Sequence, residues 1–129
     1  RLQDFMAEVA SDFAASGVDV IYGTVRLIER DDESFLAWAR EPWACVIFNI
    51  HTVHTPAGLE RAAAAFRRLI DYAIARGGSY FLTYHRWATT EQVEACYPRI
   101  REFFALKRKH DPNEAFQSEW YRHYRDAFA

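Results

Sequence analysis

Two segments of alternating polarity constrain the fold most, because a period of two is typical of a β-strand with one buried face. In residues 19–29, one side carries Ile21, Val25 and Leu27, and the other carries Tyr22, Thr24 and Arg26. In residues 45–54, one side carries Val46, Phe48 and Ile50, and the other carries Ile47, Asn49 and His51. The sequence therefore predicts two strands, each with an apolar face and a more polar face.

Helical patterns flank these two strands. Apolar residues recur at helical spacing over residues 2–15, and Gly17 follows as a stop signal. Thr55 and Pro56 are an N-cap and a first-turn proline, which open a helix that runs to about Arg76. The sequence thus predicts one helix before the strand pair and a longer helix after it.

The C-terminal half continues the alternation. Residues 79–87 predict a third strand, and Thr89-x-x-Gln92 is a capping-box pattern that opens a helix. Pro98 breaks that helix, and a second helix is predicted from Pro98 to about Lys109, before Asp111-Pro112. Residues 31–33 predict an acidic turn, and residues 34–40 a short helix. A fourth strand has no defined place; residues 116–124 or an upstream segment could supply it.

The order helix, strand, strand, helix, strand, helix favours one α+β domain over residues 1–129. An antiparallel sheet with helices on one face, in a ferredoxin-like sandwich, is the expected architecture. The chain carries 16 basic and 18 acidic residues, a net charge of −2, which gives no electrostatic basis for binding nucleic acid or an anionic membrane. Two cysteines do not make a disulfide framework, so we expect a reduced, cytoplasmic protein.

Other candidate features have ordinary structural interpretations. His51 and His54 form an H-x-x-H pair, but residues three apart on a strand point to opposite faces, so no shared metal is expected. Four aromatic residues fall four apart, and in a helix they would form one stripe for a core or an interface: Phe116, Trp120, Tyr124 and Phe128. No glycine-rich phosphate loop, Rossmann fingerprint or serine nucleophile motif is present.

A family resemblance rests on motif order. It is carried by Tyr84-His85-Arg86-Trp87, Tyr97-Pro98-Arg99-Ile100, Asp111-Pro112, Phe116, Ser118 and Trp120. This series resembles the C-terminal end of FAD-linked oxidases of the vanillyl-alcohol-oxidase type, nearest the sugar-lactone and alditol oxidases. Gly23-Thr24-Val25-Arg26, followed by Asp31-Asp32, is similar to the strand of those enzymes that carries Glu-x-Arg ahead of an Asp-Asp turn. The resemblance covers most of the chain.

The resemblance implies an active-site role for several residues. Arg26 stands at the position of the family's substrate-site arginine, and Thr24 replaces its glutamate. An arginine without that carboxylate suits a substrate carboxylate, which guanidinium binds bidentately. His85 matches the histidine of the family's Pro-His-Trp-Gly-Lys segment, although no lysine follows. Expected site residues are His85 and Tyr84 for proton handling, and Arg26, Tyr22, Thr24, Asn49 and His51 for substrate binding.

The resemblance also implies a fragment. Such enzymes hold FAD mainly with an N-terminal domain, and this end forms the cap over the flavin. We therefore expect a flavoprotein oxidoreductase that oxidises an alcohol or hydroxy-acid carbon, with its FAD-binding domain upstream of Arg1. The isolated chain is expected to bind no FAD, to lack activity and to form a homodimer. The alternative is a free-standing ferredoxin-like module that binds a small molecule or dimerises; a reading frame with about 300 or more upstream residues would favour the flavoenzyme.

Overall fold

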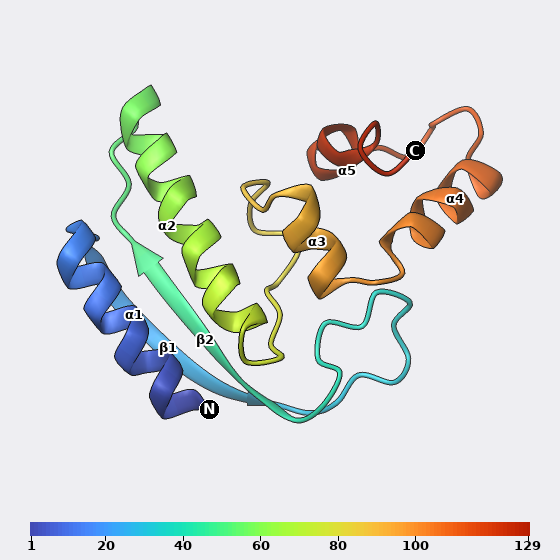
Figure 1. The fold of residues 1–129 in the computed structure, drawn as a ribbon. Coiled ribbons are helices and arrows are strands. Elements are labelled where there is room, and N and C mark those ends of the chain that lie inside the picture. The colour runs from blue at the N-terminus through green and yellow to red at the C-terminus, as the bar shows by residue number, and fades with distance from the viewer.

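The structure is a computed structural model that describes residues 1–129. It is an α+β fold with a two-stranded antiparallel sheet and five helices (Figure 1). In chain order the elements are α1 (Leu2–Ser16), β1 (Val20–Ile28), β2 (Trp43–Ile50), α2 (Pro56–Ile74), α3 (Thr90–Cys96), α4 (Ile100–His110) and α5 (Glu119–Tyr124). The predicted α+β class is therefore confirmed. No helix is long and apolar enough to cross a membrane.

Local capping signals set the helix boundaries. Gly17 ends α1 in the left-handed region, at φ 66°, which glycine adopts without a steric penalty. The Thr55 hydroxyl accepts a hydrogen bond from the Gly58 amide, with Pro56 in the first turn of α2. Thr89 and Gln92 form the predicted capping box of α3. These three predictions are confirmed. Each cap could be predicted because it depends on only a few neighbouring residues.

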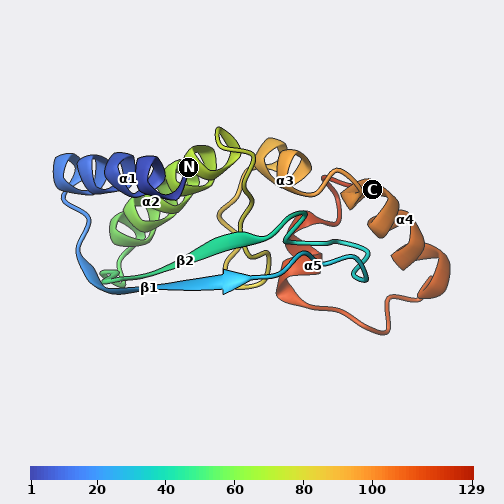
Figure 2. The ribbon, with the colours of Figure 1, turned by 90° about the horizontal axis from the view of Figure 1, so that it is seen from below.

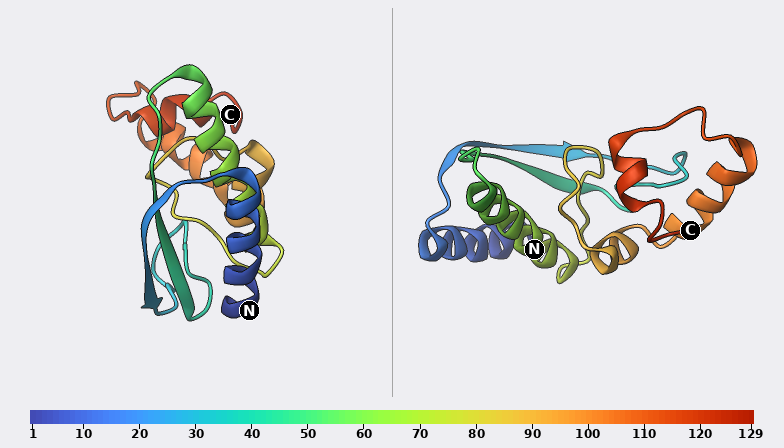
Figure 3. Two further views of the ribbon diagram at one scale, coloured as in Figure 1. Left: turned by 90° about the vertical axis from the view of Figure 1, so that its left-hand side faces the viewer. Right: turned by 90° about the horizontal axis from the view of Figure 1, so that it is seen from above.

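The sheet is an antiparallel pair with α1 and α2 on the same side (Figure 2). The register places Tyr22 opposite Asn49 and Arg26 opposite Cys45. On the helix side, the Phe48 ring packs edge-on against Phe13 of α1, with centroids 5.4 Å apart. The end-on view in Figure 3 shows the two strands and the two helices as separate layers. The other face of the sheet has no helix over it.

The predicted burial of β1 is wrong. Its apolar positions Ile21, Val25 and Leu27 are 61%, 51% and 88% exposed. The apolar face of β2 is covered more fully, because Phe48 and Ile50 pack against the buried cluster of α1 and α2. The predicted strand β1 is confirmed, but alternation in the sequence does not show whether another layer covers the apolar side of the strand.

Two predicted elements do not form. Residues 79–87 make turns and bends, and residues 34–40 form no helix. In the β1–β2 connection, the Asp31 carboxylate accepts hydrogen bonds from the amides of Glu33 and Ser34, which favours a turn. The strand predicted over residues 45–54 ends at Ile50, and residues 116–124 supply the short helix α5 and no strand.

The helices α3, α4 and α5 form a second hydrophobic core, apart from the sheet. Phe104 is fully buried and lies within 6 Å of the rings of Tyr121, Trp120 and Phe128. The β1–β2 connection also contributes, because the Arg99 guanidinium lies 3.8 Å from the centre of the Phe35 ring. Of the predicted aromatic stripe, only Phe116 is outside this core, at 80% exposed.

Candidate functional site

The uncovered face of the sheet gathers most of the predicted substrate residues. Tyr22, Thr24 and Arg26 lie at alternate positions of β1, and the register puts Asn49 and Cys45 on the same face. This is the face away from α1 and α2, since Phe48 occupies the other one. The sheet thus brings four of the five predicted substrate residues to one surface.

Arg26 has no ion pair and no hydrogen bond within the chain, unlike Arg30, which pairs with Asp32. Its side chain is exposed opposite Cys45. Burial raises the pKa of the Cys45 thiol, while the Arg26 charge acts in the opposite direction. The guanidinium therefore keeps all its donors free for a ligand that approaches this face.

His51 does not join this group. It follows the last residue of β2, and its Nδ1 atom lies 3.1 Å from an Asp19 carboxylate oxygen. Cys45, the partner of Arg26, lies at the other end of β2, and six residues of strand span about 20 Å. The structure therefore does not bring His51 together with Arg26, and His51 makes a local contact with Asp19.

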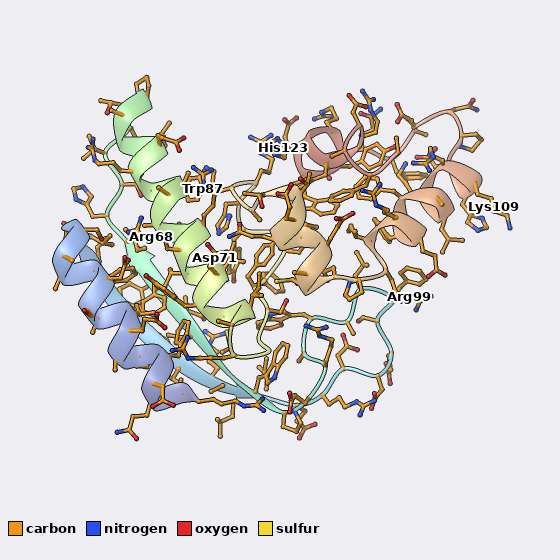
Figure 4. All side chains as sticks on the ribbon, in the orientation of Figure 1. Arg68, Asp71, Trp87, Arg99, Lys109 and His123 are labelled. Carbon is orange, nitrogen blue, oxygen red and sulfur yellow. The ribbon has the colours of Figure 1, made fainter.

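His85 lies in an aromatic cluster. Its ring stacks on Trp87 at 4.9 Å with a 20° interplanar angle, and it also contacts Phe66 of α2 at 4.6 Å. Burial among these rings lowers the pKa of His85, so the neutral imidazole is favoured. Tyr84, the other residue predicted to handle a proton, is 75% exposed. In Figure 4 Trp87 lies beside α2, consistent with its ring packing on Phe66.

A groove of about 850 Å³ joins these two sets of residues. Its walls come from α1, β2, α2 and residues 78–87, and 19 of its 27 lining residues are hydrophobic. Arg26, Asn49, Tyr84 and His85 all line it, and no acidic residue does. Volume and lining are both in the range of ligand sites. The sequence did not predict this groove. Residues 79–87 have a strand-like sequence but form no strand, and they make one wall of the groove.

Metal ligation has no geometric basis in the fold. No group of three or more His, Cys, Asp or Glu side chains lies close enough together to hold an ion. Cys45 and Cys96 are both free thiols. No protein-family model, curated protein or solved structure matches the chain.

Proposed function

We propose that the chain is the C-terminal substrate domain of an FAD-dependent oxidoreductase that oxidises an alcohol or hydroxy-acid carbon. One observation carries the proposal: Arg26 is an unpaired guanidinium on the open face of the sheet, beside Thr24 and Tyr22. Substrate sites keep such groups free, since a guanidinium that is already paired with a carboxylate cannot bind a second one bidentately.

Each residue of the proposed site has its own role. Arg26 binds the substrate carboxylate and sets the orientation of the carbon to be oxidised, with Tyr22, Thr24 and Asn49 as hydrogen-bonding neighbours. His85 accepts the hydroxyl proton, and its lowered pKa keeps the ring in the form that can do so. FAD, held by a separate domain of the full-length protein, supplies the acceptor for the hydride. Tyr84 is exposed enough to meet that domain.

We also infer that the two strands are half of a ferredoxin-like sheet. The helices α1 and α2 lie on one face only, and the order α1, β1, β2, α2 is that of the centre of a ferredoxin-like fold. Two strands alone are a marginal sheet in water. Additional strands would cover the edge of β2 and give the substrate face its full width.

Replacement of Arg26 by alanine in the full-length protein tests the substrate role. We expect kcat/KM for a 2-hydroxy acid to fall at least ten-fold, since loss of a charge-assisted pair costs about 1.5–3 kcal/mol. The matched control is Arg30→Ala, which removes an exposed arginine just beyond β1 that already pairs with Asp32. Unchanged kinetics for Arg26→Ala, with a lowered melting temperature, would assign Arg26 a structural role.

A pH profile tests His85. In the full-length protein, kcat/KM is expected to rise with pH through an ionisation below the ordinary histidine value, because burial lowers this pKa and the neutral ring is the base. His85→Asn should abolish that ionisation, whereas His123→Asn, at a histidine that does not line the groove, should retain it. An identical profile in both variants would assign the ionisation to another group.

The second candidate is a binding module without catalysis. The groove favours this binding module, because an apolar cavity of about 850 Å³ can bind a small molecule without a redox partner. Absorbance of the purified full-length protein separates the two. A flavin spectrum with substrate-dependent bleaching supports the oxidoreductase, and a full-length protein that binds no FAD even after reconstitution supports the module.

A further inference from the structure

The groove has an unpaired strand as one wall. β2 pairs with β1 along one edge only, and no backbone hydrogen bond joins residues 43–50 to any other segment. A free strand edge presents alternating N–H and C=O groups, and it is a template for another strand. Because β2 lies at the groove, its free edge opens into an apolar space and not onto bulk solvent alone.

The opposite wall is strand-like and equally unpaired. Residues 79–88 neither donate nor accept a single backbone–backbone hydrogen bond. The few backbone partners of this stretch are side chains: the carbonyls of Tyr80, Trp87 and Ala88 accept hydrogen bonds from Tyr97, Arg67 and Tyr124. The other backbone groups of residues 79–86 have no partner within the chain, and a neighbouring strand could pair with them. The sequence of this stretch predicts a strand, yet its nearest strand, β2, lies across the groove. A strand that lies in the groove between β2 and residues 79–87 would give both of them a hydrogen-bonding partner.

The helix α1 fixes the direction. Arg1 and Leu2 line the groove, and the Arg1 guanidinium lies 3.5 Å from the Glu41 carboxylate, just before β2 begins at Trp43. A segment that runs antiparallel to β2 starts near Ile50 and ends near Trp43. It therefore ends beside Arg1 and needs no long connection to enter α1.

We propose that the groove receives an extended apolar segment of polypeptide, supplied by the residues that directly precede Arg1 in the full-length protein. It lies antiparallel to β2 and antiparallel to residues 79–87, which then complete a four-stranded sheet. Its side chains toward α1 and α2 are apolar and meet Phe5, Phe66 and Leu69. The proposal deepens the ferredoxin-like arrangement inferred above and is independent of flavin chemistry. With the segment in place, a substrate would bind on the open face of the sheet, beside Arg26 and Asn49, and not inside the groove.

Disulfide trapping tests the register. In the full-length protein, every cysteine except Cys45 is replaced by alanine, and one cysteine is introduced at successive positions of the upstream segment. A strand beside β2 brings alternate positions to the face of Cys45, within the Cα separation of about 4.4–6.8 Å that a disulfide needs. We expect intramolecular cross-links at one or two positions that are two residues apart, and none at the position between them.

Hydrogen exchange gives a second test that needs no substitution. Amides of residues 79–87, and those amides of residues 43–50 that point away from β1, should exchange at least about 100-fold more slowly in the full-length protein than in the chain of residues 1–129, because new ladder bonds protect them. Amides of α4 serve as the control and should be unchanged. Equal exchange of residues 79–87 in both proteins, with no alternation in the cross-links, would overturn the proposal.

A second copy of the chain is the competing occupant. Exclusively intermolecular cross-links to Cys45, together with a full-length dimer by light scattering, would assign the groove to that copy and overturn the proposal. Loss of flavin binding or of oxidation would not affect either measurement, so failure of the proposed enzyme activity and failure of the strand proposal are distinguishable.

Discussion

The two ends of the molecule contrast in how completely they bury their apolar residues. Around α3, α4 and α5, ten buried residues form one cluster, which includes Ile70 from α2. Between α1, α2 and the sheet, the buried cluster has three: Val9, Phe13 and Leu69. Both regions are rich in apolar side chains, so the difference lies in the packing partners that the structure provides for them.

The aromatic region finds enough partners within residues 1–129 to close its core. Phe104 stacks on Tyr121 at 5.6 Å, and the Tyr124 hydroxyl donates to the Ala88 carbonyl. The sheet region instead leaves Leu27 exposed and keeps a groove beside β2. The contrast shows a closed aromatic core at one end and an open sheet region at the other, which is where we propose that another segment inserts.

The largest effect is expected from Phe104→Ala. This side chain is fully buried, so its loss removes ring contacts and leaves an enclosed cavity, at a cost of about 3–5 kcal/mol. Urea unfolding measures the change, with Phe116→Ala as the exposed aromatic control, expected within about 0.5 kcal/mol of the wild type. Similar losses for both variants would contradict a closed aromatic core.

Gln92→Ala tests the hydrogen bonds that connect α3, in the aromatic region, to α2. The Gln92 amide nitrogen donates to the Arg67 carbonyl at 2.8 Å and to the Asp71 carboxylate at 2.6 Å, which ties α3 to α2. We expect a loss of about 2–3 kcal/mol, since two acceptors lose their donor. Gln117→Ala is the control, because Gln117 is exposed. A loss no larger than that of the control would mean that α2 and α3 stay together through apolar contacts alone.

Leu69→Ala tests the incomplete side. Leu69 is 8% exposed and lines the groove, so the space vacated by its side chain merges with an existing opening. We expect about 2 kcal/mol, the transfer term without a large cavity term. Leu59→Ala, on the same helix and 44% exposed, should cost clearly less. A loss for Leu69→Ala as large as that for Phe104→Ala would remove the contrast between the regions.

The smallest effect concerns Asp111, which closes the turn after α4. Its carboxylate binds the Lys107 ammonium and the amides of Phe116 and Ala115, which lowers its pKa from 3.8 to about 2. Because the folded-state pKa is depressed, this stabilisation is fully present above pH 3.8 and is lost as the pH falls through about 2.

The melting temperature of Asp111→Asn compared with the wild type measures this effect. The wild type should melt higher at pH 5, and the difference should shrink as the pH falls to about 2, where half of the wild-type carboxyl is neutral in the folded state. Asp126→Asn, at an exposed position near the C-terminus, is the control and should show a smaller, less pH-dependent difference. A difference that stays constant from pH 5 to pH 2 would exclude the carboxylate as its cause.

Sequence reasoning located the helices well because their signals are local. Gly17, Thr55 and the pair Thr89 and Gln92 act within a few residues of their own backbone, so each can be recognised without a fold. The alternation of β1 and β2 likewise predicted which residues share a face, and Tyr22, Thr24, Arg26 and Asn49 do share one. The roles proposed for these residues and for His85 stay predictions.

What the sequence by itself determined is therefore the helices α1 to α4, the strands β1 and β2 and the faces of those strands, since a period of two or of 3.6 is a property of neighbouring residues. The tertiary structure alone decided the exposure of Leu27, the separation of His51 from Arg26 and the loss of a strand at residues 79–87. Each of these outcomes depends on whether a segment distant in the sequence packs against the residues concerned. A strand forms only when another strand completes its hydrogen bonds, and the pattern of nine neighbouring residues contains no information about that second strand.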